Sequence, residues 1–96
     1  MIGWAGGLYE EEGTATRCGG RLRLAVRMTN DEPVRRFAAA VGCGIVYGPY
    51  GNGARRKRVC RWVAEGEDAL IAADLLRPWL STARREQLER VFRADV

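Results

Sequence analysis

The sequence predicts an α+β fold in which helices pack against a four-stranded antiparallel sheet. The clearest observation is the segment 21–29, where apolar and polar residues alternate with period two, as in a half-buried strand. The segment 34–41 instead repeats apolar residues at helical spacing. Along the chain, the predicted elements follow the order helix, two strands, helix, two strands, helix, helix.

A chain of 96 residues is long enough for one domain with a modest core, so we assign residues 1–96 to a single domain. Hydrophobic residues make up 47% of the chain, which favours an ordered globular protein. No apolar run has transmembrane length, and the first residues lack the features of a signal peptide. We therefore expect a cytosolic or organellar protein that does not act at a membrane.

Histidine is absent, and cysteine is rare. Without histidine, the chain cannot be a His-metal nuclease, a Ser-His-Asp or Cys-His enzyme, or a zinc finger that uses histidine. Cys18, Cys43 and Cys60 are odd in number and lack CxxC spacing, so neither a disulfide framework nor a zinc site is expected. We interpret them as small core or strand residues.

The segment 2–11 predicts a short helix that ends at Gly13. Three glycines leave one face of this helix without side-chain bulk, which lets another backbone approach closely: Gly3, Gly6 and Gly7. Because no second helix of this kind follows, we expect two copies of the chain to meet through this face. Carboxylates fill positions 10–12, where the helix dipole is already negative, so we expect a cation there, such as a metal ion with oxygen ligands.

A β-hairpin is predicted next, with strands at 14–18 and 21–29 joined by the turn Gly19-Gly20. Alternate residues of the second strand point to the core: Leu22, Leu24, Val26 and Met28. The remaining residues form an exposed face: Arg21, Arg23, Ala25 and Arg27. These arginines fit either a solvated sheet face or a nucleic-acid contact, and the lack of acids among them favours the second interpretation.

A second helix is predicted from a cap at Asn30 or Asp31 to Gly42, with an apolar stripe formed by Val34, Phe37, Ala38 and Val41. A third strand at 44–47, a loop of strong breakers at 48–53 and a fourth strand at 59–64 follow.

A third helix is predicted from Glu67 or Asp68 to Pro78, with an apolar stripe formed by Leu70, Ile71, Leu75 and Leu76. Trp79-Leu80 is predicted to anchor the chain in the core. A cap at Ser81 or Thr82 then starts a final helix from 83 to 93, with Leu88, Val91 and Phe92 directed inward.

The charge is segregated along the chain. Residues 1–12 carry three acids and no base, 13–64 carry eleven bases against two acids, and 65–96 carry five bases and seven acids. The net charge of +9 in the middle segment indicates a polyanionic partner such as nucleic acid. Its densest part, the basic run 55–58, fits either an arm that grips phosphates or a solvated hairpin tip.

The sequence Ala-Gly-Gly-Leu-Tyr-Glu-Glu-Glu-Gly at positions 5–13 resembles the LAGLIDADG motif of the LAGLIDADG homing endonucleases. Gly7, Leu8 and Gly13 match the motif, and Glu10 and Glu12 occupy its two acidic positions. The order of the predicted elements is similar to that of the family over nearly the whole chain. The resemblance implies the family's α-β-β-α-β-β-α core with an added C-terminal helix, in which the sheet forms a saddle for DNA.

The resemblance also implies the residues of a catalytic site. A divalent metal, Mg²⁺ or Mn²⁺, would be bound by the Glu12 carboxylate and the Glu11 carbonyl. The polar residue that orders active-site water falls at Asn30. The family's basic residue near the scissile phosphate falls at Ala83, with Arg84 next to it as the nearest basic side chain.

A homodimer follows from the resemblance as well, with Gly3, Gly6 and Gly7 at its interface and double-stranded DNA along both sheets. The expected DNA-binding residues are Thr14, Thr16, Arg17, Arg21, Arg23, Arg27, Tyr47, Arg55, Arg56, Lys57, Arg58 and Arg61.

The implied function is that of a site-specific homing endonuclease, which cuts a palindromic or pseudo-palindromic target. Such a protein would be cytoplasmic and nucleoid-associated, microbial or phage-encoded, with an intron or intein as its setting and no small-molecule substrate. Two alternatives stay open. One is a DNA-binding regulator or RNA-splicing maturase on the same scaffold that no longer cuts. The other is a dimerisation module whose basic face binds nucleic acid without sequence preference.

Overall fold

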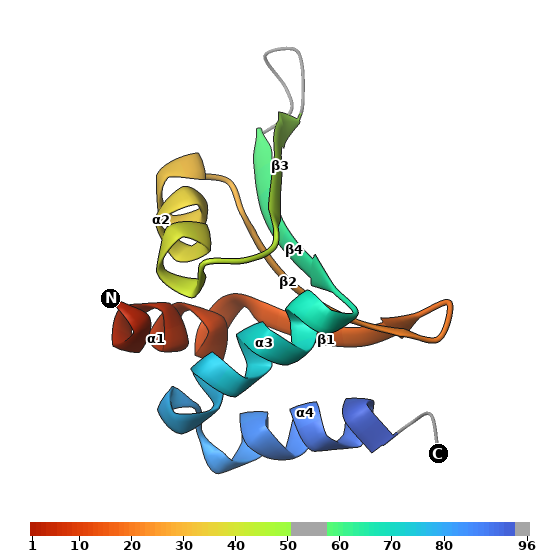
Figure 1. Cartoon of the computed structure of the whole chain (residues 1–96). Helices are drawn as coiled ribbons and strands as arrows, with labels where there is room; N and C mark the ends of the chain where they lie inside the picture. Colours follow the sequence, from red (N-terminus) through yellow and green to blue (C-terminus); the bar gives the residue numbers. More distant parts are fainter. Residues whose placement is uncertain (51–57, 94–96) are drawn as a thin grey trace.

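The computed structural model describes residues 1–50 and 58–93 (Figure 1). Its elements are α1 (Ile2–Glu12), β1 (Gly13–Cys18), β2 (Arg21–Met28), α2 (Asp31–Val41), β3 (Ile45–Tyr50), β4 (Val59–Glu65), α3 (Glu67–Leu76), the 3₁₀ helix η1 (Arg77–Trp79) and α4 (Thr82–Arg93). The predicted α+β class and order of elements are confirmed. Among the described residues, no helix is both long and apolar enough to cross a membrane.

The four strands form one antiparallel sheet in the order β1-β2-β4-β3. We call the sheet face that packs on the helices the inner face and the opposite one the outer face. Leu22, Leu24 and Val26 are buried on the inner face, as their alternation predicts, and Trp62 of β4 lies among them. The Trp62 ring meets Phe37 of α2 edge to face, with the ring centroids 4.8 Å apart. The core therefore lies between the sheet and the helices.

The second helix ends where the sequence predicts, and its caps explain why. The Asn30 side chain accepts a hydrogen bond from the Glu32 N–H at 3.2 Å, which satisfies one free donor of the first turn. Gly42 takes the left-handed conformation with φ 83° and closes the helix. Val34 and Phe37 are fully buried between these caps.

The third strand is longer than predicted. β3 continues to Tyr50 through Gly48 and Pro49, which we expected in a loop, with a shift in register between Tyr47 and Tyr50. Because β3 is an edge strand, a proline can stand in it without removing a hydrogen bond from the sheet interior. Residues 51–53 of the predicted loop lie outside the described residues.

The predicted apolar stripe of α3 is wrong except for Leu76. The helix buries a face of small residues instead: Ala69, Ala72 and Ala73, together with Leu76. Three members of the predicted stripe are exposed: Leu70, Ile71 and Leu75. Small side chains let α3 pack closely on α1, β2 and β4, and this close approach determines the face that is buried.

Trp79 is not the core anchor that the sequence predicts, although its neighbour Leu80 is buried. The Trp79 side chain is 54% exposed and lies across α1. Its ring would be 3.1 Å from a Cβ on Gly3, and its own Cβ would collide with a Cβ on Gly6. Two of the three glycines of α1 therefore make room for a side chain of the same chain.

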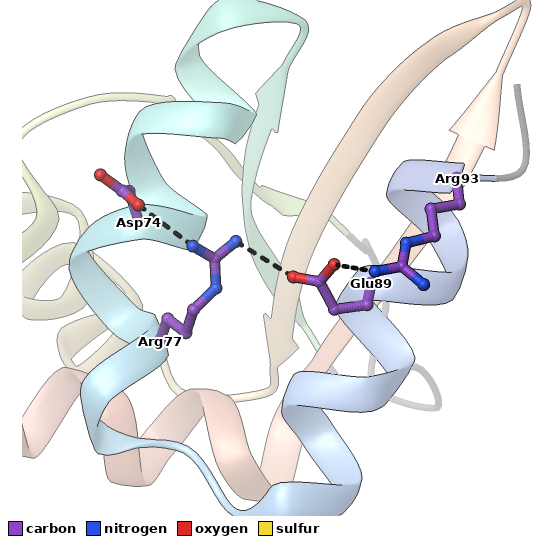
Figure 2. A network of polar contacts seen from close by, with 4 residues as sticks. All are labelled: Asp74, Arg77, Glu89 and Arg93. Atoms are coloured by element: carbon purple, nitrogen blue, oxygen red, sulfur yellow. Dashed lines mark hydrogen bonds and ion pairs between the residues drawn. The ribbon is translucent and has the colours of Figure 1, made fainter. Parts of the chain in front are cut away.

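α4 packs on the core through Leu88, which is buried, and through Val91 and Phe92, which are partly buried, as the sequence predicts. Polar contacts also connect this helix to the rest of the molecule. Figure 2 shows Arg77 between Asp74 and Glu89, with N–O distances of 3.1 and 3.8 Å. Glu89 also pairs with Arg93 at 3.5 Å. This network joins η1 to the middle of α4.

Candidate nucleic-acid interface and carboxylate site

The outer face of the sheet gathers most of the predicted DNA-binding residues. In the strand register, Thr14 and Thr16 of β1 lie opposite Ala25 and Arg23 of β2. Pairing continues from β2 to β4 and from β4 to β3. With two-residue alternation, the register places seven predicted residues on this face: Thr14, Thr16, Arg21, Arg23, Arg27, Tyr47 and Arg61.

A row of basic and aromatic side chains crosses the middle of the outer face. Arg27 and Arg61 are Cα partners between β2 and β4, and Tyr47 is the partner of Arg61 on β3. The Arg61 guanidinium lies 5.3 Å from the centroid of the Tyr47 ring, a cation–π distance. Like charges directly opposite each other are unfavourable, so an anion bound here would stabilise the row.

Two further arginines of the outer face differ in their surroundings. Within residues 1–50 and 58–93, the Nε of Arg23 is covered and has no hydrogen-bond partner. The Arg21 side chain lies against Gly66 and shares a hollow of about 220 Å³ with Glu65 and Asp68. Arg21 therefore lies near two carboxylates, whereas the Nε–H of Arg23 donates no hydrogen bond within the described residues.

Arg17 lies on the inner face, away from the other predicted DNA-binding residues. Its Nε and Nη2 donate hydrogen bonds to the carbonyls of Val91 and Phe92 at 2.9 and 2.8 Å. Its Nη1 donates to the Gly20 carbonyl at 3.0 Å. The guanidinium thus binds carbonyls at the C-terminal end of α4 and joins it to the hairpin turn, which is a structural role, and the DNA contact of Arg17 stays a prediction.

The basic run is described only at its end. Arg58 is exposed directly before β4. Arg55, Arg56 and Lys57 lie outside the described residues, so their phosphate contacts stay a prediction.

The three carboxylates at the end of α1 have different surroundings, beginning with Glu10. Its Oε1 accepts the Ser81 N–H and its Oε2 accepts the Ser81 hydroxyl, both at 2.7 Å. These two hydrogen bonds favour the charged form and hold the pKa of Glu10 below its ordinary value, with Arg84 adding a smaller effect. Ser81 itself caps α4, because its Oγ accepts the Arg84 N–H at 3.2 Å, and Glu10 holds this cap residue in place from another helix.

Arg84 supplies the positive charge that the end of α1 requires. Its Nε donates to the Glu10 carbonyl at 2.9 Å, and its Nη1 donates to Gln87 at 2.7 Å. The guanidinium also lies 5.8 Å from the centroid of the Tyr9 ring. Burial raises the pKa of Tyr9 to about 12, and Arg84 offsets part of that shift. The predicted catalytic arginine is therefore engaged in joining α4 to α1.

Glu12 faces a different part of the molecule. It is exposed and lines an open hollow of about 390 Å³ together with Arg27, Met28, Thr29 and Val59. Arg27 also belongs to the row on the outer face, so the end of α1 and the basic face meet at this side chain.

Asn30 follows directly on Thr29, so the predicted water-ordering residue is at the end of β2, next to this hollow in the chain. Its side chain is exposed and caps α2. The oxygens predicted to bind metal, the Glu12 carboxylate and the Glu11 carbonyl, are hard donors at the negative end of a helix dipole and fit a divalent cation. In the part of the chain that the structure describes, no group of three or more Asp, Glu, Cys or His side chains could hold a metal ion.

Of the three glycines predicted at the dimer interface, Gly7 alone is open. A Cβ on Gly7 would have no atom within 4 Å, whereas Trp79 covers Gly3 and Gly6. Gly7 and Trp4 are exposed on the same side of α1 and mark the part of the helix that a partner can reach.

No family model matches the sequence, and the search of curated proteins found no match. Solved structures do resemble it. The homing endonuclease I-CvuI, in complex with the I-CreI target and magnesium, superposes with a TM-score of 0.67 at 18% identity, over 95% of this chain and 65% of that one. I-CvuI in complex with its own target and calcium gives 0.66 at 15% identity, over 97% and 68%.

The archaeal intron-encoded homing endonuclease I-Vdi141I, complexed with DNA, gives a TM-score of 0.60 at 16% identity, over 81% of this chain and 54% of that one. The chain thus spans about two thirds of the length of the I-CvuI chains and about half of the length of the I-Vdi141I chain. The likeness shows the fold: a four-stranded antiparallel sheet with four α-helices, arranged as in the LAGLIDADG homing endonucleases.

Proposed function

We propose that the protein is a site-specific, double-stranded DNA homing endonuclease of the LAGLIDADG type that acts as a homodimer. The observation that carries the proposal is the position of Arg27, which lies both in the basic row of the outer face and in the hollow lined by Glu12. DNA bound along the outer face would pass the end of α1, where the carboxylate projects. The fold is that of DNA-complexed homing endonucleases, which supports this interpretation.

The outer face has the chemistry for reading base edges. Arginine side chains can donate two hydrogen bonds to guanine in the major groove, and threonine can contact either base or phosphate. Arg23 and Arg27 would read bases, because they project from β2, one of the two interior strands of the sheet. The ring of Tyr47 would hold Arg61 in place for the same purpose.

Cleavage would depend on Glu12. A bound Mg²⁺ or Mn²⁺ supplies a Lewis acid that polarises the phosphate and activates water. Glu12 and the Glu11 carbonyl would hold it, and Asn30 would hold a water molecule. Arg84 would act as a positioning residue, because its contacts are with Glu10, Gln87 and Tyr9. In a two-fold dimer, the second copy would duplicate the site and allow both strands to be cut.

One observation favours a second candidate, a DNA-binding regulator or maturase on the same scaffold that does not cut. The family's basic position near the scissile phosphate is Ala83 here, and the adjacent Arg84 is engaged in contacts within the chain. A site without that positive charge would stabilise the transition state less well.

The test is DNA cleavage after selection of bound sites from a random palindromic library. We expect the wild type to cut the selected site with Mg²⁺ or Mn²⁺ and not with EDTA. Glu12→Gln should bind the site equally well and cut about 100-fold more slowly or not at all. Glu11→Gln is the matched control and should cut at nearly the wild-type rate, because only its backbone is expected to touch the metal.

Equal cleavage by Glu12→Gln and the wild type would contradict the assignment of the metal carboxylate. Sequence-specific binding by a wild type that cuts with neither metal would favour the regulator or maturase.

A further inference from the structure

Apolar side chains form a second row on the outer face, next to the basic row. Ile45 and Val63 are Cα partners between β3 and β4, and Ala25 is the partner of Val63 on β2. Each of the three lies two residues along its strand from a member of the basic row, so all three point to the outer face. We call Ala25, Val63 and Ile45 together the apolar row.

Ile45 is the most exposed member of the apolar row. It is 58% exposed, whereas its partner Val63 is only 4% exposed. Single exposed apolar side chains are common on protein surfaces and need no function. Ile45 differs from these because it lines a hollow of about 220 Å³ together with Val63 and Tyr47. One side of this hollow is therefore apolar.

The other side of the hollow is polar, and it restricts what can enter. Glu65 and Asp68 line it together with Arg21. Two carboxylates beside one guanidinium disfavour a phosphate group, so the DNA backbone would be held elsewhere on the outer face. A base edge carries no net charge and presents both polar and apolar atoms in the major groove. It is thus the part of DNA that fits this hollow.

Exposed apolar side chains can distinguish one base from the others. In the major groove, thymine presents a 5-methyl group next to its O4 atom, and the other three bases have no methyl group. Contact between this methyl group and Ile45 would remove apolar surface of both partners from water, which is favourable. Guanine, adenine and cytosine would give Ile45 no such contact.

The strand geometry also places this contact within a half-site. Arg27 of the basic row lines the hollow of Glu12, and Ala25 lies two residues closer to the hairpin turn. Two residues of a strand span about 7 Å. For strands that run along the groove, this length equals the rise of about two base pairs. The apolar row would therefore meet a base pair farther from the Glu12 carboxylate than the one that Arg27 meets.

We propose that the apolar row is a specificity site for thymine, in which Ile45 contacts the 5-methyl group of one thymine in each half-site. The inference rests on the proposed function, which places DNA along the outer face, and it deepens that function by naming a base that the arginines do not read. Ile45 is then a specificity-determining residue, because it favours thymine over the other bases and adds no charge.

The test exchanges thymine for uracil, which removes the 5-methyl group and leaves base pairing unchanged. Binding sites are selected from the random palindromic library, and each thymine of one half-site is replaced in turn by deoxyuridine. Fluorescence anisotropy then measures the affinity of the full chain for each duplex. We expect one position at which the wild type binds about fourfold more weakly without the methyl group.

Two variants show whether Ile45 is responsible for this difference. Ile45→Ala should bind the thymine and uracil duplexes with equal affinity, because the contact is absent from both. Leu70→Ala is the matched control, since Leu70 is 52% exposed but belongs to α3 and not to the sheet. It should keep the wild-type affinity and the fourfold difference. Circular dichroism melts check that both variants fold, and the wild-type measurement requires no substitution in the protein.

A selected half-site without thymine would overturn the inference, as would a wild type that binds every uracil duplex as tightly as the thymine duplex. A fourfold difference that persists in Ile45→Ala would overturn it as well. Cleavage of the same duplexes separates the inference from the proposed function. Cleavage of the selected site without discrimination of the methyl group would refute the thymine contact alone. Discrimination without cleavage in either metal would support the contact and count against the endonuclease.

Discussion

Arginines are concentrated in two regions of the molecule, around α4 and on the outer face of the sheet, and their surroundings differ. Around α4, Arg17 and Arg84 donate to carbonyl groups, and Arg77 pairs with two carboxylates. On the outer face, neither Arg27 nor Arg61 forms an ion pair with any carboxylate in the described part of the chain. The first group therefore holds the fold through contacts within the chain, whereas Arg27 and Arg61 are the arginines that the proposed function assigns to DNA.

Gly6 and Gly7 are neighbours in α1, but only Gly6 is covered by another side chain of the same chain. Substitutions at these two positions should have the largest effects on stability and on association. Gly6→Leu should lower the free energy of unfolding by about 3 kcal/mol, because its side chain would collide with Trp79. Gly7→Leu should keep or raise the stability of the monomer by up to about 1 kcal/mol, since leucine is the better helix former. It should instead abolish the dimer. Urea unfolding together with sedimentation measures both quantities.

If both glycine variants lost stability equally, the open side of α1 would not be open in solution. If Gly7→Leu remained dimeric, the two copies would not approach through that side.

An arginine that holds α4 should affect folding more than DNA binding. Arg84→Met removes the hydrogen bonds to Glu10 and Gln87 and should cost about 2 kcal/mol of unfolding free energy. Arg90→Met, at a less engaged position on the same helix, should cost less than about 0.5 kcal/mol. Urea denaturation of the two variants makes the comparison. Equal unfolding free energies of the two variants would show that the Arg84 contacts do not stabilise the packing of α4 on α1.

The smallest effect concerns the pH dependence of the same junction. The Ser81 hydrogen bonds lower the pKa of Glu10 below its ordinary value of 4.5. A lowered pKa in the folded state contributes stability above pH 4.5 that is lost as the pH falls through the folded-state value. Glu10→Gln lacks this contribution, so its melting temperature should be below that of the wild type at pH 7 and approach it in acid. A constant difference across this range would contradict the role of the Glu10 charge in holding Ser81.

Alternation and capping predicted the parts of the fold that depend on local pattern. The residues Leu22, Leu24 and Val26 are buried as period two requires, and Asn30 and Gly42 bound α2. The face of α3 was not predictable in this way. Burial there depends on how closely the helix approaches its neighbours, so alanines were buried and larger apolar residues were not.

The candidate site shows the same limit. Arg17 points to the face opposite that of Thr14 and Thr16 in β1. The two-residue alternation of a strand was enough to predict this difference from the sequence. The contact between Arg84 and Glu10 joins residues 74 positions apart, and no local pattern indicates it. The meeting of Glu12 with Arg27 likewise depends on the folded sheet.

The most direct test compares Arg17→Gln with Arg27→Gln, two arginines of adjacent strands that point to opposite faces. We predict that Arg17→Gln lowers the unfolding free energy by about 2 kcal/mol and leaves the DNA affinity of the folded protein unchanged. Arg27→Gln should leave stability within about 0.5 kcal/mol and weaken binding to the selected site about 10-fold or more. The opposite pattern, or equal losses of affinity in both, would contradict the division between structural and DNA-binding arginines.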